Sequence, residues 1–491
     1  MINKRQEISD SLLYLISTSL SAILPIITIP IFTRILRPED YGIYGLSMIY
    51  AIFMSGLANF GLSLAYERNH FQYSKSSEKQ AQLLFSSLIF IITNFIILAV
   101  FTFIFRTNIS QIMTNSPNNG ILILTTFASQ FILGTANNYY FIYLKNERLA
   151  KAYTKYKMSV TILYFILSLI LVAYIKIGIL GIAIAQLMSG ATMFLYLSFS
   201  LLKRLPISFN HKILLESLKI SYLLTPRVFI GVINTQFDKY MINLLSTVSG
   251  VGVYQIGKSV SELAFIFMTA LQNVFNPKVY SILFEEKAKG GDSVGKYLTP
   301  FLYVSIFITL CISLFSREIV TILMPVDYHA AIPIITILSM YYGLMFFGKI
   351  TSVQLIYMKK TGLTSILTIL SVVVNVSLNI PLIIKYGAIG AAWATMLAGT
   401  ISGTISFIVA QHYYRINYEW EKVGWIIGLF IFGSILTAFT ITQDYPYILS
   451  LNIKITTLAS YIYIGIKYRI ISKDNILEVR NIMNPSQVTM S

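Results

Sequence analysis

Two residues of opposite charge stand four positions apart in a stretch that is apolar enough to cross a bilayer. The stretch is VYQIGKSVSELAFIFMTALQ, Val253–Gln272, and the charged residues are Lys258 and Glu262. An ionisable residue inside a membrane helix costs about 2.5–3.5 kcal/mol on insertion scales, so it faces a partner or a wet cavity. Neighbours at i and i+4 can also bridge each other. The pair is therefore either a structural ion pair or part of a polar site.

Other polar groups share one helical face with this pair or form similar faces on other apolar stretches. At about 100° per residue, one stripe holds Tyr254, Lys258, Ser261, Glu262, Phe265, Thr269, Gln272 and Asn276. The other faces hold Arg227, Gly231, Asn234 and Asp238; Ser17, Ser21 and Thr28; Gln130, Gly134, Asn137 and Phe141; and Lys349. A surface facing lipid would not concentrate these groups, so we expect a polar interior cavity between two lobes.

The charges of this predicted cavity favour an anionic ligand. Arg227, Lys258 and Lys349 outnumber Glu262, which leaves the cavity positive. Phosphate groups bind well to the guanidinium fork of arginine and to the point charge of lysine.

Several polar residues have both a structural and a functional interpretation. Asp238 is either a coupling group of the cavity or a helix-end residue beside Lys239. The run Asn137–Tyr140 either makes interhelical hydrogen bonds and packs its rings, or recognises sugars with amides and stacked rings. The predicted substrate-binding set is Arg227, Lys258, Lys349, Asn137, Tyr140, Asn234 and Tyr254, with Glu262 and Asp238 as coupling or ion-pairing groups.

The sequence shows no clear pattern of catalytic or metal-binding residues. No histidine has metal-ligand spacing with another histidine or a carboxylate cluster, and no nucleophile–base pair can be argued. The single cysteine, Cys311, excludes an internal disulfide framework and a cysteine metal cluster. We predict a protein that is not an enzyme and has no metal or cofactor.

The composition places these groups in a membrane. Of 491 residues, 56% are hydrophobic and 12% are charged, against about 25% charged in an ordinary soluble domain. Apolar runs of about 20 residues recur along the chain, which predicts an all-α polytopic membrane protein. About fourteen spans are expected, at residues 11–33, 43–65, 83–105, 120–144, 157–175, 178–202, 217–237, 251–275, 298–323, 331–357, 363–384, 387–411, 423–441 and 447–466.

The net charge of +17 is unevenly divided between alternate connections. Most lysines and arginines fall on one side, and the other side holds only Arg34, Arg37, Arg106, Lys176, Lys239, Arg317, Lys385 and Lys454. The positive-inside rule then places both termini in the cytoplasm. We attribute the basic charge to orientation and to contact with anionic lipid, not to nucleic acid. The start, MINKRQEISD, lacks a small-residue cleavage site, so we expect an uncleaved first helix.

Three pairs of segments match at a separation of about 210 positions, which indicates an internal repeat. The pairs are Tyr41–Tyr44 with Val251–Tyr254, Phe141–Glu147 with Leu355–Thr361, and Gly178–Ala185 with Gly387–Ala394. Each unit holds six spans, an even number, so both copies enter the membrane in the same direction. We predict parallel six-helix lobes at residues 1–205 and 206–412, followed by two more helices and a cytoplasmic tail at 413–491.

The segment SLLYLISTSLSAILPIITIPIFTRILRPEDYGIYGLSMI, Ser11–Ile49, resembles the bacterial polysaccharide exporter family. This family contains the O-antigen, capsule and teichuronic-type flippases of the multidrug/oligosaccharidyl-lipid/polysaccharide exporter superfamily. The features that carry the resemblance are Pro25, Pro30, Arg34, Leu36, Pro38, Glu39, Tyr41, Gly42 and Tyr44. The resemblance extends over about residues 8–412 through the span count and the helix openings Gly178/Gly181 and Gly387/Gly390.

The resemblance implies a substrate and a route. The substrate is an undecaprenyl-diphosphate-linked oligosaccharide, carried to the outer leaflet of the bacterial cytoplasmic membrane by alternating access. The implied contacts are diphosphate on the cations of the cavity and sugars against its aromatic wall, with Arg34, Arg37 and Asp40 in a gating hairpin. A polysaccharide polymerase and chain-length machinery are implied partners. The last two spans depart from the twelve-span core of the family.

Three alternatives remain. A peptidoglycan-precursor flippase would share the fold and nearly the same head group. A multidrug or cation exporter of the superfamily typically has an acidic residue in its first span, and Ser11–Thr33 contains none. A polysaccharide polymerase or ligase would need a large outer loop with catalytic residues, which the short predicted connections do not provide.

Overall fold

In the computed structural model of the chain, the described residues are helical almost throughout and contain no strand. They are residues 13, 17, 20, 21, 24, 27–73, 76–203, 205–442 and 445–470. The side chains of Leu223, Leu224, Arg227, Val228, Ala288, Ile441 and Thr442 lie outside the description. The chain forms two compact units, Met1–Gln255 and Ile256–Ser491.

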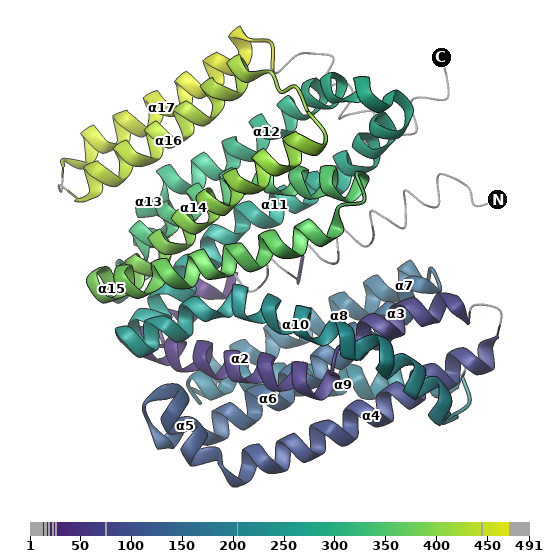
Figure 1. The fold of residues 1–491 in the computed structure, drawn as a ribbon. Helices are drawn as coiled ribbons and strands as arrows, with labels where there is room; N and C mark the ends of the chain where they lie inside the picture. The colour runs from purple at the N-terminus through teal and green to yellow at the C-terminus, as the bar shows by residue number, and fades with distance from the viewer. Residues whose placement is uncertain are drawn as a thin grey trace. The chain divides into compact units, whose positions relative to one another are not determined.

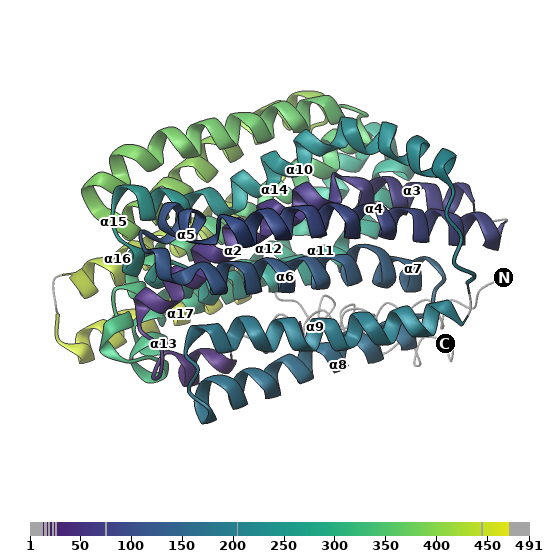
Figure 2. The ribbon, with the colours of Figure 1, turned by 90° about the horizontal axis from the view of Figure 1, so that it is seen from below.

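The first unit is a layered bundle of long helices (Figure 1). Its helices are α2 (Pro38–Asn59), α3 (Leu62–Gln72), α4 (Ser77–Ile104), α5 (Arg106–Thr114), α6 (Gly120–Thr135), α7 (Phe141–Asn146), α8 (Ala150–Leu169), α9 (Ile179–Leu202), α10 (His211–Leu245) and the start of α11 (Val248–Glu286). Helices α8 and α9 run side by side (Figure 2), and α10 packs against α2, α3 and α4. The division thus places α10 in the first unit, whereas the lobe boundary near residue 205 remains a prediction from the repeat.

A π-helical turn, η2 (Ala136–Tyr140), interrupts the span between α6 and α7. Two tyrosines of this turn form hydrogen bonds with two different neighbouring helices. Tyr139 is fully buried and donates a hydrogen bond to Asn59 Oδ1 at 2.6 Å. The Tyr140 hydroxyl lies 2.7 Å from Ser198 Oγ on α9. With both tyrosines anchored in the core, Asn137 is left exposed.

The described residues of the second unit contain the rest of α11 and six further α-helices. They are α12 (Gly290–Leu314), α13 (Ser316–Leu323), α14 (Ala331–Tyr357), α15 (Thr361–Tyr413), α16 (Trp420–Thr442) and α17 (Tyr447–Lys467). Helices α16 and α17 form a hairpin that packs on α12 (Figure 1). A buried ion pair joins this hairpin to α13, because Lys454 Nζ donates to both oxygens of Glu318 at 2.7 and 2.8 Å.

The helices are long enough for a polytopic membrane protein. Ten helices in the described part of the chain have the length and apolar character of membrane spans. Helix α15, with 53 residues, holds two of the predicted spans. Helices α10 and α11, with 35 and 39 residues, are longer than a bilayer core of about 30 Å requires. The first predicted span, 11–33, lies partly outside the described residues.

The two predicted helix openings share an unusual backbone. Gly178, before α9, has φ 74° and ψ −150°, and Gly387, inside α15, has φ 57° and ψ −135°. This region of backbone space is essentially restricted to glycine. Ser402 donates to Ser371 Oγ at 3.2 Å, so the two halves of α15 fold back on each other at Gly387. The common conformation agrees with the repeat inferred from the sequence.

Candidate substrate-binding site

The polar stripe of α11 contacts α14 in the second unit. Tyr342 Oη donates to Glu262 Oε1 at 3.4 Å, and its ring lies 5.8 Å from the ring of Phe265. Lys349, two turns further along α14, places its Nζ 4.8 Å from the centroid of the same Phe265 ring. The structure therefore brings together three residues of the predicted stripe and cavity. Tyr342 was not predicted, because a tyrosine in an apolar span carries no signal of its own.

Lys258 lies one turn before Glu262 on α11 and is half-buried. Its role as a binding group remains a prediction. Lys349 is also half-buried. Among the described residues, no carboxylate oxygen lies within 4.0 Å of its Nζ, the distance limit for an ion pair. A Phe265 ring offers Lys349 only a cation–π interaction, of about 0.5–2 kcal/mol. Such a lysine keeps its capacity to bind an anion.

Two predicted residues of the first unit bind each other. Tyr254 Oη on α11 donates to Asp238 Oδ2 on α10 at 3.0 Å, and both residues are buried. Asp238 is thus an interhelical acceptor and not a free helix-end carboxylate. Asn234, one turn earlier on α10, is exposed. Arg227 belongs to the same helix, but its side chain lies outside the described residues.

The predicted sugar-binding run separates into buried and exposed members. Tyr140 is buried against α9, where its ring lies 5.3 Å from that of Phe194. Asn137 is exposed and accepts a hydrogen bond from Lys157 Nζ at 2.8 Å. Lys157 was missed because the predicted span begins at this residue, which made it a connecting cation. In the structure α8 begins at Ala150, so Lys157 lies two turns inside the helix.

The predicted gating hairpin leads into α2. Arg34 is exposed in the turn before the helix. The backbone N–H of Arg37 donates to Asp40 Oδ2 at 2.8 Å, and Pro38 occupies the first helical turn. Asp40 and Glu39 also suit the positive end of the helix dipole. The observed contact of Asp40 is therefore helix capping, and gating by the hairpin remains a prediction.

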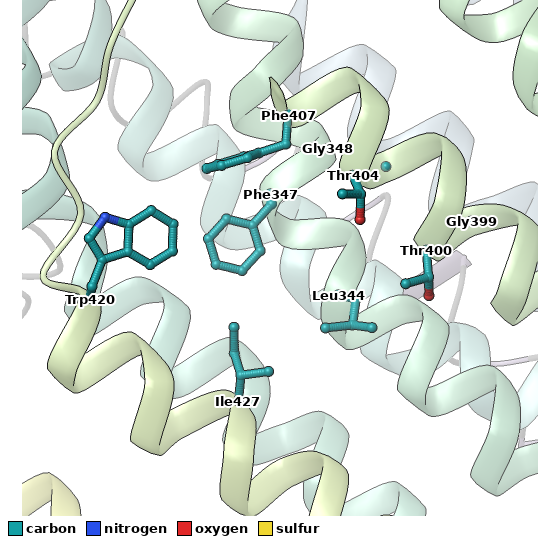
Figure 3. A pocket seen from close by; sticks show the side chains of 10 residues that line it. Leu344, Phe347, Gly348, Gly399, Thr400, Thr404, Phe407, Trp420 and Ile427 are labelled. Atoms are coloured by element: carbon teal, nitrogen blue, oxygen red, sulfur yellow. The ribbon is translucent and has the colours of Figure 1, made fainter. Parts of the chain in front are cut away.

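An apolar cavity of about 200 Å³ lies within the second unit (Figure 3). Its lining comes from α14, α15 and α16, with the rings of Phe347, Phe407 and Trp420 around the hollow. The only side-chain oxygens in the lining are those of Thr400 and Thr404. Without a charged group, this cavity does not suit a phosphate and is separate in chemistry from the face that carries Lys349.

A buried histidine lies outside the predicted spans, at the end of α3. His70 Nε2 is 3.2 Å from Glu147 Oε1 and 3.4 Å from Gln80 Nε2. Burial lowers the pKa of His70 below its ordinary value of 6.5, and the nearby Glu147 carboxylate opposes this shift only in part. The described residues hold no group of three or more histidine, cysteine or acidic side chains that could bind a metal ion.

The polysaccharide biosynthesis protein family matches residues 31–333, which is more than half of the chain. The chain belongs to the polysaccharide biosynthesis protein family. The family match agrees with the resemblance found at Ser11–Ile49. It places the chain among proteins of glycan assembly and leaves the particular glycan open.

A relative found by sequence agrees with the family. The chain is 26% identical over 211 residues to the probable low-salt glycan biosynthesis flippase Agl15 of Haloferax volcanii. That match spans 43% of this chain and 45% of the relative, less than half of its length.

Solved structures share the fold. The lipid II flippase MurJ in an inward closed conformation matches with a TM-score of 0.69, covering 94% of this chain and 99% of MurJ at 17% identity. An inward-facing multidrug resistance MATE transporter matches with a TM-score of 0.64, covering 80% and 94% of the two chains at 17% identity. At this identity the likeness shows the fold alone, which is the predicted polytopic helical fold. These relatives are flippases and transporters, the class of protein that the sequence predicts for this chain.

Proposed function

We propose that the chain is a flippase for an undecaprenyl-diphosphate-linked oligosaccharide used in surface polysaccharide synthesis of the O-antigen or capsule type. It moves this lipid from the cytoplasmic to the outer leaflet of the bacterial cytoplasmic membrane by alternating access, with both termini in the cytoplasm. Family membership supports the glycan class. The single structural observation that supports the substrate chemistry is Lys349, a half-buried cation in a membrane helix. It faces a phenyl ring, and no carboxylate of the described residues lies within ion-pair distance of it.

The diphosphate is the group that suits this face of α11 and α14. A lysine ammonium has three donors, and charge-assisted bonds to phosphate oxygens are about twice as strong as neutral ones. In this proposal Lys258 and Lys349 bind the diphosphate, with Phe265 beneath Lys349. The predicted contacts of Arg227, Asn137, Tyr140, Asn234 and Tyr254 with substrate belong to the first unit and stay predictions.

Glu262 is the proposed coupling group. Tyr342 donates to this carboxylate, and Lys258 lies one turn away on the same helix. In this proposal a bound diphosphate competes with Glu262 for the same cations, and Glu262 carries the proton that is exchanged for the lipid. Proton binding and lipid release then alternate as the conformation changes. Outward movement of two negative charges gains at most about 4.6 kcal/mol per 100 mV of membrane potential, as a second driving force.

The proposal is tested by glycan export in cells. Lys258→Ala and Lys349→Gln are expected to abolish surface glycan while the protein inserts at the wild-type level. Lys385→Gln is the matched control, because Lys385 is exposed and also lies over an aromatic ring, at 5.1 Å from the Tyr386 centroid. Normal surface glycan with both Lys258→Ala and Lys349→Gln would contradict the assignment of the diphosphate to this face of α11 and α14.

A physical partnership with a polysaccharide polymerase and its chain-length machinery belongs to the same proposal. It follows from the product, because a lipid-linked unit in the outer leaflet must be consumed by a chain-forming reaction. Crosslinking and co-purification of the full chain from membranes test this partnership. Purification of the chain without a polysaccharide polymerase would argue against a stable complex.

A further inference from the structure

We propose that the first unit carries a second oxyanion-binding site, formed by Lys157 on α8 and Asn137 in the π-helical turn. It binds an oxyanion of the substrate head group, either a phosphate oxygen or the carboxylate of an acidic sugar. This inference rests on the proposed flippase function and adds a residue set to it.

Within the residues that the structure describes, no carboxylate balances the charge of Lys157. Its Nζ donates to the neutral amide oxygen of Asn137 at 2.8 Å and lies 5.3 Å from the centroid of the Phe141 ring. Among the residues that the structure describes, no carboxylate oxygen is within ion-pair distance of Lys157. The ammonium lies on a residue about 10 Å along α8 from its first residue, inside a candidate membrane span.

Lys454 on α17 is a buried lysine whose charge is paired inside the protein. Its side chain is fully buried, and Glu318 meets its charge with both carboxylate oxygens at 2.7 and 2.8 Å. Breaking such a buried pair is strongly destabilising, which is why its partner is present. Lys157 has an amide and a ring in the place of that carboxylate. An anion from outside the chain would complete its environment.

The π-helical turn exposes the Asn137 amide next to open space at Gly134. Tyr139 and Tyr140 are held by Asn59 and Ser198, so the exposed member of the turn is Asn137. Its Oδ1 accepts from Lys157, and its amide Nδ2 is a further donor on this exposed residue. A Cβ built on Gly134, one turn earlier, would meet nothing within 4 Å. π-helical turns occur frequently at functional sites.

Two donors of different kind therefore lie side by side. The ammonium of Lys157 retains two N–H groups beyond its bond to Asn137, and the Asn137 amide adds another. Together they suit a single oxyanion better than a neutral hydroxyl, because an anion offsets the cost of a lysine charge in a membrane helix.

The test measures binding to the full chain in lipid nanodiscs with three synthetic probes. The probes are a polyprenyl diphosphate without sugar, the same lipid with a neutral hexose, and the same lipid with a uronic acid. We expect Lys157→Gln to raise the Kd by about tenfold to a hundredfold, the value of one charge-assisted hydrogen bond. An equal loss for all three probes identifies a phosphate oxygen, and a loss confined to the third identifies the sugar carboxylate.

Variants of the same helix pair separate binding from folding. Lys155→Gln removes an exposed lysine of α8 and should leave the Kd unchanged. Asn137→Asp places a carboxylate against Lys157, so it should weaken binding like Lys157→Gln while thermal stability is kept or raised. Lys157→Arg should retain most of the affinity.

Three outcomes overturn the inference. Wild-type affinity of Lys157→Gln for every probe would show that this lysine does not touch substrate. Wild-type affinity of Asn137→Asp would show that Lys157 requires only a polar contact within the protein and does not bind the substrate. A wild-type chain that binds none of the probes would overturn the proposed function itself, and with it this site.

Discussion

Gly252 of α11 lies directly against the backbone of Pro38, the first residue of α2. A Cβ built on Gly252 would collide with the Pro38 carbonyl oxygen. The reverse contact is present as well, because a Cβ on Gly42 would collide with the carbonyl oxygen of Val248, the first residue of α11. Gly42 and Gly252 are counterparts in the predicted repeat, 210 positions apart, and Pro38 and Val248 have the same separation. The two helix starts thus contact each other in the reciprocal manner of a two-fold interface.

Alanine at either glycine should destabilise the protein. The obstacle is backbone on the opposite helix, so the helices must separate, and we expect a loss of about 1–3 kcal/mol for Gly252→Ala or Gly42→Ala. The measurement is thermal unfolding in detergent. Gly424→Ala on α16 is the control, because its Cβ would meet nothing within 4 Å. Unchanged melting of both α2 and α11 variants would contradict the close crossing.

The last helical hairpin should depend on one ion pair. Lys454→Met leaves the mostly buried Glu318 carboxylate without its partner, and we expect a loss of up to about 3–5 kcal/mol. Lys454→Met combined with Glu318→Leu should recover most of that stability, since no charge is then left uncompensated. Thermal melts of the single and double variants measure the difference. A single variant as stable as wild type would show that the pair does not hold α17 to the unit.

Stability should fall in mild acid because of His70. Folding lowers the pKa of His70, so the unfolded chain takes up a proton at a higher pH than the folded chain does. The free energy of unfolding therefore decreases as the pH falls below about 6.5 and through the folded pKa. His70→Gln should flatten this dependence between about pH 7 and pH 5.5, measured by melting temperature. An equally steep decline in the variant would assign the acid sensitivity to other groups.

Glu262→Gln should remove proton-driven transport. In vesicles with a pH gradient and no membrane potential, we expect the variant to lose transport, because it has no carboxylate to protonate. Transport driven by membrane potential alone should persist in part. A variant as active as wild type under the pH gradient would leave Glu262 as the group that accepts from Tyr342 and lets Lys258 reside in the membrane.

The sequence predicts the helices of this fold better than it predicts their contacts. Hydropathy locates most spans, and the paired glycines Gly178 and Gly387 mark helix openings because their backbone demands glycine. The charge pattern, however, treats Lys454 as a cation of an outer connection, whereas the structure buries it against Glu318. Whether such a lysine is buried depends on a partner far away along the chain. A single sequence does not show which distant residues contact each other.

The same limit applies to the candidate site. The helical stripe identifies Glu262 and Phe265 correctly as one face, since both follow from the period of one helix. Tyr342 and Lys157 were missed, the first because its type is common in apolar spans and the second because it lies at the edge of a hydropathy window. Tyr254 and Asp238 were predicted separately, and only the structure shows that they bind each other.

The measurement that tests the central claim most directly is lipid flipping by the purified chain in vesicles of bacterial phospholipid. A synthetic undecaprenyl-diphosphate oligosaccharide is placed in both leaflets, and an impermeant glycan-modifying enzyme outside reports how much reaches the outer leaflet. We expect the wild-type chain to expose nearly all of the lipid, and Lys349→Gln to expose only the half that begins outside. Exposure of half by the wild-type chain, or equal flipping by Lys349→Gln, would contradict the account.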